Sequence, residues 1–65
     1  MKLSIDISPD NAAFEVQPSK EVARILVGVA DRLESEFDLA RAVRQPPRML
    51  YDCNGSRCGK VEVWP

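Results

Sequence analysis

Residues 19–37, SKEVARILVGVADRLESEF, decide the fold because they carry the longest helical periodicity in the chain. Ile25 and Ala30 lie beside the main apolar stripe and widen it. This pattern predicts an amphipathic helix with one face against a sheet or another helix. The stripe itself recurs at spacings of four, three, four and four residues: Val22, Leu26, Val29, Leu33 and Phe37.

Proline and serine mark the start of this helix. Ser19 follows Pro18 and is the expected N-cap, since a serine hydroxyl accepts a hydrogen bond from an otherwise unpaired helical N–H. Gly28 interrupts the helix at a cost of about 1 kcal/mol relative to alanine. Either it has no structural role, or the backbone approaches a strand closely there.

The end of the helix has two alternatives. Ala40 and Val43 continue the stripe, so the helix either runs on to Arg44 or breaks near Asp38 and resumes as a short second helix. The pair Pro46-Pro47 ends it in both cases, because proline lacks the N–H donor and disfavours helix in the residue before it.

Residues 2–8 alternate polar and apolar side chains up to Pro9, which predicts a strand with Leu3, Ile5 and Ile7 on its buried face. Residues 12–17 are a short mixed connection. In that connection, Phe14 is the first candidate for the core and Val16 the second.

Residues 48–52 and 57–64 flank Asn54-Gly55, a strong hairpin signal because both residues tolerate positive φ. Asp52 is a candidate to cap this turn through its side chain. Alternation along the last strand places Val61 and Val63 on one face. On the other face it places Lys60, Glu62 and Trp64.

These elements predict an α+β fold with the order β-α-β-β, in which one main helix packs on a three-stranded sheet that ends in a hairpin. At 65 residues the chain is expected to form a single domain, residues 1–65, with a small core. It has no linker, internal repeat or long apolar segment, so we expect no membrane association and a cytoplasmic location.

The composition argues against catalysis. The chain has no histidine and two cysteines, so the commonest general base and metal ligand is absent. A chain of this size also rarely supplies both a pocket and the residues that support it. We therefore expect a non-enzymatic protein with no cofactor and no metal of its own.

Charge is distributed unevenly along the chain. Residues 1–38 hold four basic and eight acidic side chains, a net charge of −4, and residues 39–65 hold five basic and two acidic, a net charge of +3. This asymmetry is a recognition feature only if folding keeps the two parts apart; otherwise it is a mixed solvated surface.

The candidate partner-binding residues follow from this charge map. A cluster of arginines suits phosphate or an acidic partner protein, and a run of acids is either a solvated helix face or an anionic patch for a basic groove. An aromatic on the outer sheet face is a natural anchor for a partner or for a homodimer. The candidates are Arg41, Arg44, Arg48, Arg57, Glu34, Glu36, Asp38 and Trp64.

Cys53 and Cys58 flank the predicted turn and allow three interpretations. They are small packed thiols, a disulfide formed on oxidation, or half of a zinc site shared between chains. The third requires at least a dimer, because one chain has no further cysteine or histidine.

Four segments taken together resemble short uncharacterised proteins of phages and prophages. The segments are Asp10-Asn-Ala-Ala-Phe14-Glu15, Val22-Ala-Arg-Ile-Leu26, Ala30-Asp-Arg-Leu-Glu34 and Asp52-x-Asn54-Gly55-x-x-x-Gly59. The resemblance implies a small accessory protein that binds and modulates a host complex, including anti-defence and anti-CRISPR roles. It carries over no catalytic residue.

Two functions are therefore expected from the sequence. The first is a non-enzymatic accessory protein that binds a host protein complex through the candidate residues. The alternative is a small nucleic-acid-binding regulator that uses the arginines of the hairpin, with an affinity that falls steeply with salt.

Overall fold

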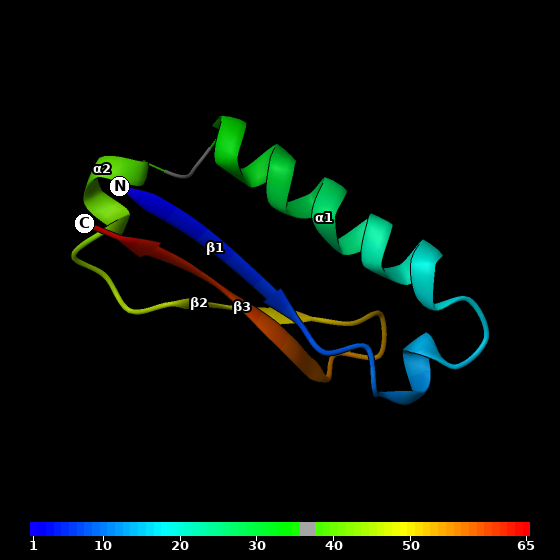
Figure 1. Cartoon of the computed structure of the whole chain (residues 1–65). Helices are drawn as coiled ribbons and strands as arrows, with labels where there is room; N and C mark the ends of the chain where they lie inside the picture. The colour runs from blue at the N-terminus through cyan, green and yellow to red at the C-terminus, as the bar shows by residue number, and fades with distance from the viewer. Residues whose placement is uncertain (36–37) are drawn as a thin grey trace.

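The computed structural model of the chain describes residues 1–35 and 38–65. In this described part, three strands form an antiparallel sheet and one long helix covers a single face of it (Figure 1). The α+β fold expected from the sequence is confirmed. Its elements are β1 (Lys2–Ile7), the 3-10 helix η1 (Ala12–Phe14), α1 (Pro18–Ser35), α2 (Leu39–Ala42), β2 (Arg48–Tyr51) and β3 (Arg57–Trp64).

The strand order is β1-β3-β2, so β3 lies in the centre and both of its neighbours run antiparallel to it. Asp6 of the acidic part of the chain lies opposite Lys60 of the basic part. Because the sheet joins β1 directly to β3, folding does not keep the two charged parts of the chain separate. The overall surface is therefore of mixed charge.

The core lies between α1 and the sheet. Ile25 and Val29 are its buried helical residues, with Val22 and Leu33 partly buried beside them. Leu26 and Ala30 are exposed, so the buried face of α1 is rotated away from the predicted stripe and toward Ile25. Phe37, the last residue of that stripe, lies outside the described residues.

The connection before α1 contains two candidate core residues, and only one of them lies in the core. Phe14 is buried in the core, as predicted, because η1 turns it under the first turns of α1. Val16 is 89 % exposed, and its predicted burial is wrong. It follows η1 where the chain bends outward to enter the helix.

The structure contradicts the predicted N-cap of α1 and confirms one of the two alternatives for the end of this helix. α1 begins at Pro18, whose fixed φ suits the first helical position, so Ser19 lies inside the first turn and is not the N-cap. At the other end α1 stops at Ser35, and a separate helix, α2, begins at Leu39. Asp38 is the N-cap of α2, where its Oδ1 accepts a hydrogen bond from the Ala40 N–H at 3.0 Å.

Close backbone approach occurs at Gly59 rather than at Gly28. A Cβ on Gly28 would meet nothing within 4 Å, so of the two alternatives for Gly28 the close approach to a strand is excluded. A Cβ on Gly59 would lie 2.0 Å from the carbonyl oxygen of Asp6. Gly59 therefore lets β1 and β3 pair closely.

The predicted hairpin is confirmed, with a different turn geometry. Among the described non-glycine residues none has positive φ, and Gly55 has a φ of 80°. Asn54 therefore does not adopt the left-handed conformation that a two-residue Asn-Gly turn requires. The pairing instead shifts register between Leu50 and Tyr51, and this bulge leaves Cys58 without a partner on β2.

Candidate functional site

A groove of about 310 Å³ lies between the α2–β2 connection and the end of β3. On one side it is lined by Pro46 and Pro47 of the connection and by Arg48 of β2. On the other side it is lined by Val63 and Trp64 of β3. We call it the terminal groove, because α2 and both chain termini lie at this end of the molecule (Figure 1). It combines apolar surface with Arg48, and the carboxylate among its lining residues, Glu62, is paired with Lys60. Such a surface suits a protein segment that carries both apolar and acidic side chains.

Trp64 is the aromatic side chain of this groove and is 50 % exposed. Alternation from the buried Val61 places it on the sheet face away from α1, as predicted. Lys60 and Glu62 share that face and form an ion pair, whose hydrogen bond raises the pKa of Lys60. Within the described part of the chain no helix covers this face (Figure 1), so Trp64 is accessible to a partner.

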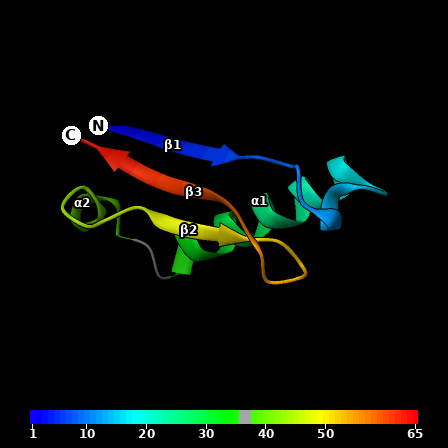
Figure 2. The same ribbon diagram turned by 90° about the horizontal axis from the view of Figure 1, so that it is seen from below.

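Of the four predicted arginines, Arg48 lines the terminal groove. Arg41 and Arg44 flank the lining residues Ala42 and Val43 in the sequence and are not themselves lining residues. All three arginines are exposed. Arg57 lies at the far end of the sheet, where β3 begins after the turn, and does not join them (Figure 2).

The predicted acidic residues are distributed around the same end. Glu34 is an exposed residue in the last turn of α1, and Asp38 is engaged in capping α2. Glu36 lies outside the described residues. Since acids and arginines share this end, its charge pattern is mixed rather than uniformly basic.

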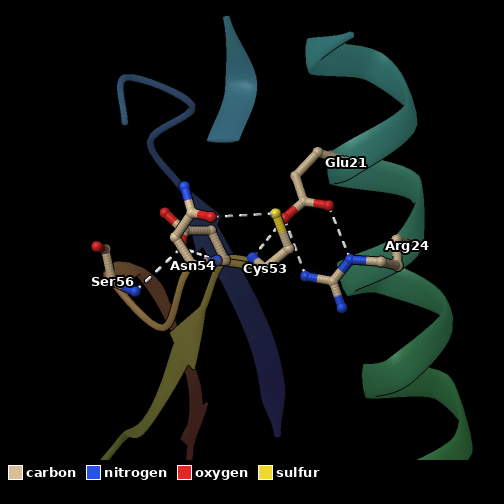
Figure 3. A network of polar contacts seen from close by, with 6 residues as sticks. Glu21, Arg24, Cys53, Asn54 and Ser56 are labelled. Atoms are coloured by element: carbon tan, nitrogen blue, oxygen red, sulfur yellow. Dashed lines mark hydrogen bonds and ion pairs between the residues drawn. The ribbon is translucent and has the colours of Figure 1, made fainter. Parts of the chain in front are cut away.

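A second polar cluster holds the hairpin turn against α1 (Figure 3). Glu21 is only 8 % exposed, and its Oε2 accepts a hydrogen bond from the backbone N–H of Cys53 at 2.7 Å. Arg24, one turn along α1, donates to both oxygens of the same carboxylate, from Nε at 2.7 Å and from Nη2 at 2.9 Å. The guanidinium compensates the buried charge, so that Glu21 can tie the turn to the helix.

Asp52 completes this cluster from inside the turn. It is 5 % exposed, and its Oδ1 accepts the backbone N–H groups of Asn54 at 2.9 Å and Ser56 at 3.0 Å (Figure 3). Its Oδ2 accepts the side-chain amide of Asn11 at 3.0 Å. The predicted cap is confirmed, and it also fixes the loop that follows β1. We interpret Glu21 and Asp52 as structural, because all the polar groups around them are engaged with one another.

Glu21 accepts hydrogen bonds from Arg24 and from the Cys53 backbone, and we call this arrangement the Glu21 clamp. It predicts a contribution to the free energy of unfolding that is lost in acid. The hydrogen bond from Arg24 is the main reason that the pKa of Glu21 falls from 4.5 to about 2, against the opposing effect of burial. A carboxyl whose pKa is lower in the folded than in the unfolded state stabilises the fold at pH values above the unfolded-state pKa. For Glu21 this contribution is lost as the pH falls from about 4.5 to 2. Glu21→Gln should therefore lower the unfolding midpoint at pH 7 and converge with the wild type near pH 2.

Thermal unfolding of both proteins between pH 7 and 2 measures this convergence. Glu15→Gln, which changes an exposed carboxyl of the same type, is the matched control and should follow the wild-type curve. A constant difference between wild type and Glu21→Gln at all pH values would contradict the assigned role of the ionised carboxylate.

The two cysteines occupy different environments and both are free thiols. Cys58 packs in the core, where burial raises its pKa and keeps the thiol protonated. This confirms the packed interpretation for Cys58. Cys53 is exposed in the turn, so its predicted packing is wrong. The turn leaves Cys53 open to solvent although its backbone N–H is bonded to Glu21 of α1.

Neither a metal site nor a membrane span emerges from the described residues. No three ligand-type side chains among residues 1–35 and 38–65 are grouped so that they could hold a metal ion. The helices of the same residues are too short or too polar to cross a bilayer.

Comparison with known proteins identifies no relative: no family model, no curated protein and no solved structure matches the chain. The functional interpretation therefore depends on the residues and their geometry.

Sequence reasoning missed two features of these sites. The sequence identifies Pro46 and Pro47 only as helix terminators, although they also line the terminal groove. The spacing of Glu21 and Arg24 is the i, i+3 spacing of a helical ion pair, and it could have revealed half of the clamp. The bond from Glu21 to Cys53 spans 32 residues, and no local pattern indicates it.

Proposed function

We propose that this chain is a small non-enzymatic accessory protein of phage or prophage origin that binds a host protein or protein complex in the bacterial cytoplasm. The terminal groove is the binding site, and an acidic segment with an apolar anchor residue is the feature of the partner that it recognises. Modulation of a host defence complex, including an anti-CRISPR role, is the form of this function that the resemblance to phage proteins supports.

The observation that carries the proposal is that Trp64 and Arg48 line one groove, while Arg41 and Arg44 lie in and just after α2 at the same end of the molecule (Figure 1). Tryptophan and arginine are the side chains most enriched among residues that dominate binding energy at protein interfaces. Trp64 lies in the last position of β3 and Arg48 in the first of β2, so a rigid sheet positions both.

The nucleic-acid alternative has less support from the arrangement of the arginines. Arg48 lies opposite Val61, and Arg57 lies four residues from Val61 along β3. At about 3.3 Å per residue, roughly 13 Å of strand separates the two positions. The hairpin arginines therefore lie at two separate places on the sheet and do not form one compact basic cluster.

Affinity capture from bacterial lysate with the tagged protein tests the proposal. Trp64→Ala should weaken capture of the specific partner about 30-fold, the effect of removing a central aromatic anchor worth about 2 kcal/mol. Arg41→Glu/Arg44→Glu should weaken it about tenfold at low salt. Arg57→Glu reverses the same charge at the far end of the sheet and should leave capture unchanged.

Capture in the presence of nuclease separates the two functions. A protein that survives nuclease, and is lost only with the groove variants, supports the proposed function. Recovery of nucleic acid that disappears at moderate salt would favour the regulator, and equal capture by all variants would exclude the terminal groove as the binding site. Thermal unfolding of each variant shows whether a loss of capture reflects a loss of folding.

A further inference from the structure

β1 leaves one edge of the sheet open. Along Lys2–Ile7 none of the described elements lies on its outer side (Figure 2). The opposite edge, β2, is shorter, follows the pair Pro46-Pro47 and adjoins the bulge near Tyr51. Short length, prolines and bulges are features that prevent an edge from pairing with another chain. β2 has them, whereas β1 is regular over its six residues.

The apolar face of β1 is also incompletely covered. Leu3 and Ile5 lie opposite Val63 and Val61, on the side of the sheet that faces α1, yet they are 38 % and 37 % exposed. Figure 2 shows the reason: α1 crosses the sheet diagonally, from near the end of β1 toward β2, and leaves the first half of β1 bare.

The solvent-accessible area of the molecule is consistent with this partial exposure of β1. The accessible area is 4723 Å², compared with about 4,200 Å² expected for a folded monomer of this mass.

The backbone of β1 offers alternate residues to a partner. The Ser8 N–H donates to the Cys58 carbonyl at 2.8 Å, which identifies the even-numbered residues as the ones bonded to β3. The N–H and C=O groups of the odd-numbered residues, Leu3 and Ile5 among them, therefore face outward. An antiparallel partner strand must place its own outward residues opposite these.

A second copy of the chain meets this requirement with complementary charge. We infer that two copies pair antiparallel along β1 about a two-fold axis at Ser4, so that Leu3 of one copy lies opposite Ile5 of the other. In this register Lys2 lies opposite Asp6 of the second copy, and Asp6 opposite its Lys2. The segment Lys-Leu-Ser-Ile-Asp is thus self-complementary: both charges meet their opposites and both apolar residues meet apolar ones.

The proposed dimer extends the sheet from one copy into the next and does not depend on the terminal groove. Its interface is one strand wide, below the roughly 1,200 Å² of a stable complex, so we expect a weak dimer with a Kd on the order of 100 µM. Sedimentation analysis from about 10 µM to about 1 mM covers this range.

Amide hydrogen exchange on the unmodified protein identifies the interface. The Leu3 and Ile5 amides should exchange quickly at low concentration and become protected as concentration rises. The Ser4 and Asp6 amides, which face β3, should be protected at both concentrations. A protein that stays monomeric to 1 mM would overturn the inference, as would a dimer without new protection at Leu3 and Ile5.

Charge variants test the register. Lys2→Glu and Asp6→Lys should each weaken self-association about tenfold, because each places like charges opposite one another twice. An equimolar mixture of the two variants restores opposite charges at both positions, so it should dimerise about as well as the wild type. Lys20→Glu, which makes the same charge change on α1, should have no effect. Failure of the mixture to recover association would exclude this register.

Discussion

Gly59→Ala is expected to unfold most of the protein at 25 °C. The added Cβ would lie 2.0 Å from the Asp6 oxygen, 3.0 Å from the Asp6 carbonyl carbon and 3.1 Å from the Ile7 Cα. All three are backbone atoms of β1, so no side-chain rotation relieves the contact and the strands must separate. Overpacking of side chains alone costs about 1–3 kcal/mol, and displaced backbone costs more.

This loss is large relative to the stability of the domain, which for 65 residues is about 3–10 kcal/mol. Urea unfolding followed by circular dichroism, at one fixed protein concentration, measures it. Gly28→Ala is the matched control, because its Cβ meets nothing within 4 Å and alanine favours the helix by about 1 kcal/mol. The two substitutions should therefore have opposite signs. A wild-type midpoint for Gly59→Ala would contradict the close pairing of β1 with β3.

Asp52→Ala should have the second largest effect, a loss of about 3 kcal/mol in the free energy of unfolding. The substitution removes an acceptor for the Asn54 and Ser56 N–H groups and for the Asn11 side chain. Hydrogen bonds to a charged group contribute about 1.5–3 kcal/mol each, and bonds that share one carboxylate do not add fully. The loop after β1 and the hairpin turn should both loosen, because this carboxylate holds them together.

Two further variants define the role of the Asp52 carboxylate. Asp52→Asn keeps one carbonyl oxygen for the turn but presents an amide donor to the Asn11 donor, so it should cause an intermediate loss of about 1–2 kcal/mol. Asp10→Ala removes an exposed carboxylate nearby and should change stability by less than about 0.5 kcal/mol. Equal stability of Asp52→Ala and Asp10→Ala in urea unfolding would show that the buried contacts of Asp52 contribute nothing.

Two of the candidate binding residues, Arg48 and Trp64, line the terminal groove, but the sequence does not predict the groove itself. Trp64 was correctly placed on the outer sheet face, because side chains alternate along a strand whatever surrounds it. Arg57 was grouped with the other arginines, although the hairpin carries it to the opposite end of the sheet. That error arises because spacing along the chain does not determine distance across a hairpin.

Local interactions account for what the sequence by itself determined: the main helix, the first strand, the hairpin and the cap that Asp52 places on the turn. Each depends on residues a few positions apart, so periodicity and turn chemistry are sufficient to predict it.

Only the tertiary structure decided which face of α1 is buried, why Gly59 must be glycine, and how Glu21 holds the Cys53 backbone. It also left β1 as a bare edge and made a groove from the two ends of the hairpin strands. These features join residues far apart in the chain, and two of them, the buried face of α1 and the bond from Glu21 to Cys53, depend on the angle at which α1 crosses the sheet. That angle is set by the packing of all the core side chains together, so no single stretch of sequence encodes it.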